Sequence, residues 1–160
     1  MNPPDEGADV DDTIADAFVI ASRALVGLAI RSINAAPVEV TLPQHRLMVL
    51  LAARGSRTIG DLAEQLGIDQ SNASRLTDRL EKLGLIARER STSDRRAVDV
   101  SLTTVGEELL ETVHTHRRQE VKRVLAHMSP RQLNAMVRAL NSFSTAAEEN
   151  TDKNWSAYAL

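Results

Sequence analysis

The segment from Thr58 to Leu102 changes its hydrophobic period partway along, and this change limits the folds open to the chain. Up to Leu83 the apolar residues recur every three or four positions, as they do on one face of a helix. From Ala97 onward apolar residues alternate with others, which is the period of a half-buried strand. Gly67-Ile68-Asp69 is short enough to be a turn between two helices. Helix, tight turn, helix and hairpin together predict a winged helix-turn-helix.

Helix-capping signals locate the remaining elements. Thr41 and Gln44 have the spacing of a capping box, with Pro43 inside the first turn, and Ser129 and Gln132 repeat that spacing. The predicted helices begin at Asp11 or Asp12, Thr41, Thr58, Asp69, Thr104 with Glu107 as its capping-box partner, and Ser129, and the predicted strands span 86–90 and 97–102. We therefore expect a mainly α fold with a small β-hairpin wing.

Composition agrees with a helical protein and excludes several classes. Hydrophobic residues make up 42% of the 160, but only four are aromatic, so the core must rest on aliphatic side chains. The absence of cysteine excludes disulfide scaffolds, thiolate catalysis, Cys-ligated zinc and thiol redox sensing. No apolar run approaches the roughly 18 residues of a membrane span, and no signal segment opens the chain. A soluble cytoplasmic protein is expected.

The net charge of −3 conceals an asymmetry. Residues 1–16 hold six acids and no base, so the rest of the chain carries a net positive charge of three. Between Gln70 and Arg96 seven basic residues face four acids. This local excess is consistent with a polyanion-binding surface, although an ordinary solvated charged face would give the same balance.

The helix after Asp69 carries the side chains best suited to reading DNA. At 100° per residue its apolar residues, Ala73, Leu76, Leu80 and Leu83, fall on one face, which we expect to be buried. The other face presents Ser71, Ser74, Arg75, Asp78 and Lys82, flanked by Gln70, Asn72 and Arg79. Short polar side chains can approach base edges, and an arginine can donate two hydrogen bonds to guanine O6 and N7.

Asp78 lies three residues from Arg75 and four from Lys82, so we expect it to pair with either cation. An ordinary amphipathic helix with a solvated face remains the alternative interpretation of this segment. The hairpin that follows weakens that alternative. Asp94-Arg95-Arg96 stands at its tip, where a wing would meet the neighbouring minor groove, and Asp94 can hold one guanidinium extended. Solvated charge is the alternative for the tip.

Several sequence fragments resemble the MarR/SlyA-type bacterial transcription regulators, from the first helix to about Glu149. The most specific are Leu62-Ala63-Glu64-Gln65-Leu66-Gly67-Ile68, Ser74-Arg75-Leu76 and Leu80-Glu81-Lys82-Leu83-Gly84-Leu85-Ile86. The wing, from Asp94-Arg95-Arg96 through Leu102-Thr103 to Gly106, is similar to the family's D-x-R and L-T-x-x-G patterns.

The resemblance implies a homodimer that binds double-stranded DNA, usually as a repressor. Two winged helices would occupy successive major grooves of a pseudo-palindromic operator. Carried over by position, Ser71, Ser74 and Arg75 would meet bases or nearby phosphates, Arg79 the backbone, and Arg96 the minor groove with Asp94 as its brace. Geometry adds Gln70 and Asn72. The implied organisation is a flexible acidic tail (1–10), a dimerisation region (11–36 and 104–149), a DNA-binding domain (41–103) and a C-terminal tail (150–160).

The resemblance also implies a small phenolic or lipophilic effector, bound where the dimer helices meet the winged helix. The corresponding walls would come from Arg23, His45, Arg46, Met48, Leu109 and Val113. Packing and surface roles are the better expectation for each of these residues, so no ligand site is assigned, and no cofactor is expected.

Other function classes find little support in the sequence. The nucleophile elbow, the phosphate loop and the dinucleotide fingerprint are all absent, so we do not expect an enzyme. His114 and His116 fall on different faces of a helix, which argues against a metal site. A winged helix can instead bind proteins; such a module would be indifferent to DNA and would tolerate Arg96→Ala.

Overall fold

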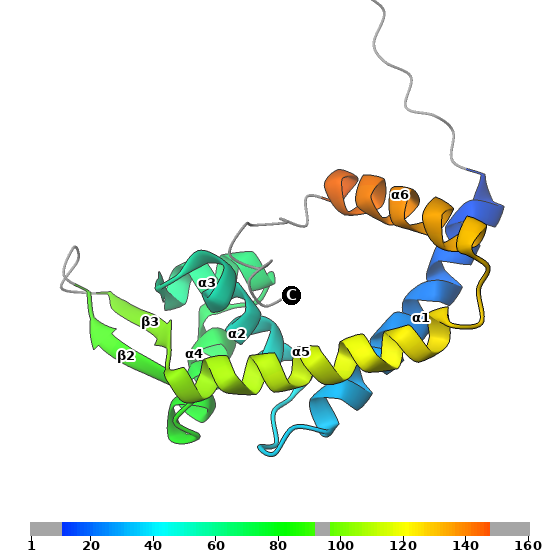
Figure 1. Ribbon diagram of the computed structural model, residues 1–160. Coiled ribbons are helices and arrows are strands. Elements are labelled where there is room, and N and C mark those ends of the chain that lie inside the picture. The colour runs from blue at the N-terminus through cyan, green and yellow to red at the C-terminus, as the bar shows by residue number, and fades with distance from the viewer. Residues whose placement is uncertain (1–10, 92–96, 148–160) are drawn as a thin grey trace, which may run out of the picture.

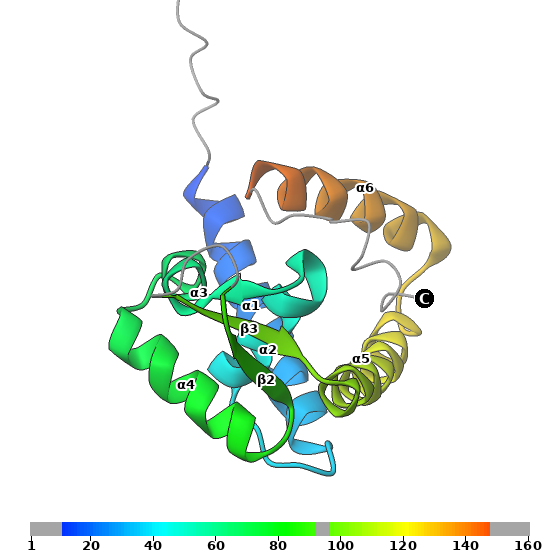
Figure 2. The ribbon, with the colours of Figure 1, turned by 90° about the vertical axis from the view of Figure 1, so that its left-hand side faces the viewer.

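The computed structural model describes residues 11–91 and 97–147 of the chain, and it is mainly helical with one small antiparallel sheet (Figure 1). The elements are α1 (Asp12–Asn34), α2 (Leu42–Arg54), β1 (Arg57–Thr58), α3 (Ile59–Leu66), α4 (Gln70–Lys82), β2 (Ile86–Arg90), β3 (Val98–Leu102), α5 (Thr104–Leu125) and α6 (Pro130–Ala146). Helices α2, α3 and α4 gather around the sheet, while α5 runs away from it alongside α1 and leads to α6 (Figures 1 and 2). The predicted winged helix-turn-helix is confirmed.

Most helix starts lie where the capping signals place them. Asp11, Thr41, Thr58, Asp69 and Ser129 each accept a backbone N–H of the first turn, so that their side chains satisfy otherwise orphaned donors. One prediction is wrong. Helix α5 is capped by Thr103, whose hydroxyl oxygen accepts from the N–H of Gly106 at 3.1 Å, and Thr104 is already helical.

The sheet has a strand that periodicity did not predict. Its order is β1-β3-β2, and Arg57 and Thr58 of β1 pair with Val100 and Asp99 of β3. Two residues are too few to show an alternating pattern, so this strand exists only because β3 offers it an edge. Strands β2 and β3 form the predicted hairpin, in which Arg88 lies opposite Val100.

The hydrophobic core is centred on the winged helix and extends to the end of α1 and the first half of α5. Leu47 and Met48 of α2, Leu62 of α3, Leu80 of α4 and Val100 of β3 have no exposed surface. The start of α5 is packed closely against this core, because a Cβ built on Gly106 would lie 2.1 Å from the carbonyl oxygen of Leu85. This contact fixes where α5 leaves the domain.

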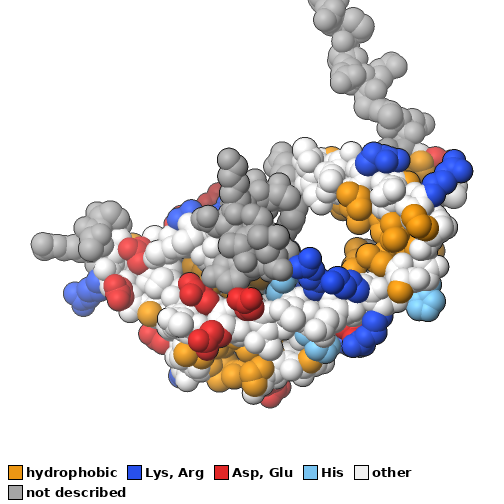
Figure 3. Space-filling view, viewed as in Figure 1, with side chains coloured by type: hydrophobic (Ala, Val, Ile, Leu, Met, Phe, Trp, Pro, Cys, Tyr) orange, Lys and Arg blue, Asp and Glu red, His pale blue; other side chains and the backbone are white. Residues whose placement is uncertain are grey.

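Outside the winged helix, many apolar side chains are exposed in the protomer. On α1 these are Ile14, Phe18, Val19, Ile20, Leu25, Val26 and Ile30, and on α6 they are Val137, Leu140 and Phe143. Helix α6 buries none of its residues, and its Phe143 stacks on Phe18 of α1 with ring centroids 4.7 Å apart. Apolar side chains line the hollow between α6 and the bend of α1 and α5 (Figure 3).

The expectation that no segment approaches the length of a membrane span is wrong for α1. Within the described residues this helix is long and apolar enough to cross a membrane by length and composition, with an 18-residue window of mean hydropathy 1.7. Only 6% of that window is buried inside the protomer. Length and composition alone do not distinguish a membrane span from a helix that another protein surface covers.

Candidate nucleic-acid interface

Helix α4 carries the candidate interface, and its buried face differs in part from the prediction. Ala73 and Leu80 have no exposed surface, as expected. Leu83 is instead 42% exposed, because the helix ends at Lys82 and Leu83 is its C-cap. Thr77 is fully buried in its place, and its hydroxyl donates to the carbonyl oxygen of Ser74 at 2.8 Å. That internal bond lets a polar residue occupy the apolar face.

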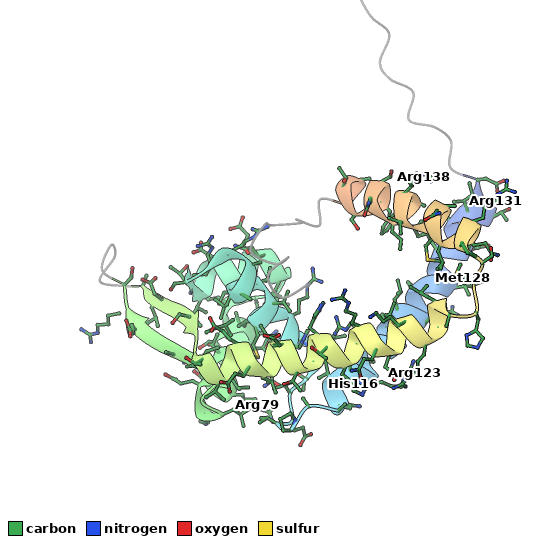
Figure 4. The ribbon with its side chains drawn as sticks, viewed as in Figure 1. Arg79, His116, Arg123, Met128, Arg131 and Arg138 are labelled. Atoms are coloured by element: carbon green, nitrogen blue, oxygen red, sulfur yellow. The ribbon has the colours of Figure 1, made fainter. Side chains whose placement is uncertain are left out.

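The structure brings the predicted α4 residues together on the solvent side of the helix. The exposed residues are Gln70, Ser71, Asn72, Arg75 and Arg79, and Ser74 is half-buried. Figure 4 labels Arg79, near the lower edge of the winged helix. The N-terminal half of α4 is thus a short polar surface with an outward arginine, a composition suited to the major groove.

Two of these residues are held by the N-cap of the same helix. The hydroxyl of Ser71 donates to Asp69 Oδ1 at 2.5 Å, and the side-chain amide of Asn72 donates to Asp69 Oδ2 at 2.6 Å. The hydrogen bonds from Ser71 and from the N–H of Asn72 hold the pKa of Asp69 below its usual value. Asp69 therefore orders the groups that we expect to approach the DNA, a role that its capping position could have indicated.

Asp78 does not pair as predicted. Its Oδ1 accepts from Nη1 of Arg88 on β2, and Arg88 Nη1 also lies 3.7 Å from Glu81 Oε2. Within the described residues, no ion pair joins Asp78 to Arg75 or to Lys82. Sequence reasoning missed Arg88 because its proximity to α4 depends on how the hairpin folds back onto that helix.

The wing itself is described only up to its tip. Strands β2 and β3 run antiparallel to the pair formed by Arg90 and Val98. Asp94, Arg95 and Arg96 lie outside the described residues. Their roles at the minor groove stay predictions.

Two histidines and an arginine gather between α2 and α5. His45 of α2 is 5% exposed, and burial together with the charge of Arg117 lowers its pKa to about 4. Burial also lowers the pKa of His114 and of Arg117, both on α5. Arg117 Nε and Nη2 are buried without a hydrogen-bond partner among the described residues. His45 is therefore neutral at pH 7, and Arg117 offers two unused donors.

Five of the six residues considered for an effector site lie either in the core or at the exposed surface. Met48, Leu109 and Val113 belong to the core, whereas Arg23 and Arg46 are exposed. His45 adjoins Arg117, whose charge contributes to the lowered pKa of His45. Across residues 11–91 and 97–147 no three His, Asp or Glu side chains are placed to hold a metal ion.

Comparisons with known proteins agree with the winged-helix fold. A family model described as the MarR family matches residues 40–98. The uncharacterized HTH-type transcriptional regulator YfiV of Bacillus subtilis is 34% identical over 110 residues, which are 69% of each chain. The HTH-type transcriptional repressor MdtR of the same organism is 30% identical over 72% of this chain and 74% of its own.

Solved structures extend the likeness to the flanking helices. The crystal structure of RV1404 from Mycobacterium tuberculosis has a TM-score of 0.77 at 35% identity, covering 89% of this chain and 98% of its own. NadR, solved in complex with 4-hydroxyphenylacetate, has a TM-score of 0.61 at 25% identity over 90% of this chain and 98% of its own.

Proposed function

The chain belongs to the MarR family of DNA-binding transcriptional regulators, and we propose that it is a ligand-responsive repressor that binds a pseudo-palindromic operator as a homodimer. Regulators of this family are not enzymes. The observation that carries the proposal is the exposed polar face of α4, with Arg75 outward and unpaired among the described residues.

In this proposal different side chains contact different parts of the DNA. Ser71, Ser74 and Arg75 meet base edges or nearby phosphates, with Gln70 and Asn72 beside them, and Arg79 meets the backbone. Arg95 and Arg96 reach the minor groove from the wing tip, where Asp94 braces Arg96. The fixed order of helix and hairpin along the chain supports the simultaneous use of two grooves.

The test is selection of bound duplexes from a random pool at about 150 mM salt, a concentration at which phosphate contacts alone bind weakly. We expect enrichment of a pseudo-palindrome whose half-sites are about 10 bp apart. A pool that stays random would contradict the proposal and favour the alternative, a winged helix that binds another protein.

The exposed apolar surfaces of α1 and α6 support the dimer. These helices, with α5, correspond to the region 11–36 and 104–149, and 41–103 corresponds to the DNA-binding domain. A contiguous apolar surface of this kind is unusual on a soluble monomer, and a partner protomer would remove it from water. A cytoplasmic location follows from the same proposal, because the partner then covers α1.

Leu25→Glu and Phe143→Glu are expected to turn the dimer into a monomer at micromolar concentration. Each substitution places a charge where the proposed interface is apolar, and Leu25 is 58% and Phe143 49% exposed in the protomer. Sedimentation velocity measures the change. Leu42→Glu is the matched control, because Leu42 is also exposed, at 40%, but begins α2 within the DNA-binding domain. A wild-type monomer, or dimeric Leu25→Glu and Phe143→Glu variants, would refute this architecture.

We also propose that the effector is a small phenolic acid held by Arg117. Two buried donors without partners and the neighbouring His45 support an anionic ligand at this place, and NadR binds 4-hydroxyphenylacetate. Figure 3 shows basic and histidine side chains on the inner side of the bend, beside the hollow.

Arg117→Gln is expected to abolish the response to such an acid. In the wild type, millimolar 4-hydroxyphenylacetate should raise Tm and weaken operator binding, since a ligand stabilises the state that binds it. Arg123→Gln, on the same helix but 69% exposed at its side chain, should keep the response. If 4-hydroxyphenylacetate changed neither the Tm of the wild type nor its affinity for the operator, this effector class would be contradicted.

A further inference from the structure

Arg88 stands between the wing and the recognition helix α4. It occupies the middle of β2, opposite Val100, and its side chain is only 20% exposed. Its Nη1 donates to Asp78 Oδ1 and lies 3.7 Å from Glu81 Oε2, so one strand residue lies within ion-pair distance of two carboxylates of α4. Arg88 does not lie on the exposed face of α4 that presents Arg75.

Asp78 has other partners within reach on its own helix. Residues three and four apart are neighbours on a helix surface, which places Arg75 one turn before Asp78 and Lys82 one turn after it. A carboxylate without a partner would attract either cation. Arg75 is the more consequential of the two, because a guanidinium paired with Asp78 has fewer donors left for a base edge.

Arg88, on strand β2, is a better partner for Asp78 than Arg75 is. Arg88 is half-buried and held by the hairpin, so it loses little side-chain freedom when it pairs, whereas the exposed Arg75 side chain would lose more. The pairing observed in the structure agrees with this preference.

We propose that Arg88 is a positioning residue for DNA recognition, which engages the Asp78 carboxylate and thereby keeps the Arg75 guanidinium available to the DNA. The inference rests on the proposed function, since it assigns value to Arg75 only as a DNA contact. Arg88, on strand β2, would then affect the affinity for DNA without contacting the bases.

The experiment measures binding of the selected operator by wild type, Arg88→Met, Asp78→Asn and the double variant. Methionine keeps an unbranched apolar stem at position 88 and removes every donor. We expect Arg88→Met to weaken binding by the dimer about two- to fivefold, because in each half-site the freed carboxylate competes for Arg75 with the modest strength of an exposed pair on a helix surface. Asp78→Asn should bind like the wild type, and the double variant should return to the Asp78→Asn value, because it has no carboxylate to capture Arg75.

The rescue separates this role from a purely structural one. If Arg88 served only to anchor the hairpin, removing Asp78 as well could not restore binding, and a double variant as weak as Arg88→Met would overturn the proposal. Thermal unfolding of all four proteins identifies any loss of fold. Arg123→Ala is the charge control: it removes an exposed arginine that pairs with Glu120 on α5, and we expect unchanged operator binding.

Operator binding by an Arg75→Ala variant distinguishes a failure of the Arg88 proposal from a failure of the proposed DNA-binding function on which it rests. A weak Arg75→Ala variant beside an unaffected Arg88→Met variant would overturn the role of Arg88 and leave the operator contact standing. A wild type that prefers no duplex over random DNA would overturn both.

Discussion

Replacing Gly106 with alanine will lower the free energy of unfolding by about 3 kcal/mol or more. The new Cβ would lie 2.1 Å from the carbonyl oxygen of Leu85 and 3.1 Å from Leu102 Cδ2. The oxygen belongs to backbone between α4 and β2, so it cannot turn aside as a flexible side chain would. Either α5 or the segment at Leu85 must move, and both border the fully buried core.

Gly60→Ala provides the matched control for this prediction. A Cβ at Gly60 would meet Thr58 Oγ1 at 3.7 Å, an ordinary contact, and Gly60 lies inside α3. Alanine there should raise stability by up to about 1 kcal/mol through helix propensity. Urea unfolding at one fixed protein concentration compares the three proteins. Equal midpoints for Gly106→Ala and wild type would show that the start of α5 is not tightly seated.

Arg75→Ala is expected to cost roughly 1–3 kcal/mol per half-site, and therefore about 2–6 kcal/mol for a dimer on its operator. The loss removes two hydrogen bonds to one base pair, so sequence preference at that position should relax. Fluorescence anisotropy with the selected operator and with random duplex measures both effects. An equal loss on the two duplexes would mean that Arg75 contacts only phosphate.

Arg79→Ala supplies the contrast, because Arg79 is expected to meet the backbone. Its loss should weaken binding about equally on all sequences and reduce the salt slope by about 1 per half-site, and therefore by about 2 for the dimer. The two arginines lie one turn apart on α4 and are both exposed. A difference between them therefore reports what each contacts rather than how much charge the helix carries.

Local signals predicted most of the fold. A cap or a glycine stop acts within four residues, so Thr41, Asp69 and Ser129 could be assigned from neighbouring letters alone. The failures lie where distant segments decide the outcome. Strand β1 needs the edge of β3, and Thr77 is buried because of what packs on α4 rather than because it is apolar.

The candidate site divides in the same way. The polar face of α4 follows from helical periodicity, and the exposed positions of Ser71, Arg75 and Arg79 agree with it. The ion pair of Asp78 and the proximity of Arg117 to His45 depend on contacts from β2 to α4 and from α5 to α2, which no periodicity encodes. The spacing of apolar residues correctly predicted helix α1. The same spacing could not predict that the apolar side chains of α1 would be exposed on the surface of the protomer.

The exposure of the apolar side chains of α6 has a consequence for the concentration of this protein that a cell needs. In the proposed dimer, α6 would gain its stability from meeting another copy, because it buries none of its residues within the protomer. Dilution would then favour the unassembled chain. Newly made molecules that stay solitary would expose two apolar helices to proteases, whereas paired ones would be spared. Operator occupancy would then rise with about the square of the protein concentration when that concentration is low. The concentration needed for regulation would be set by dimerisation of the protein and not by the DNA.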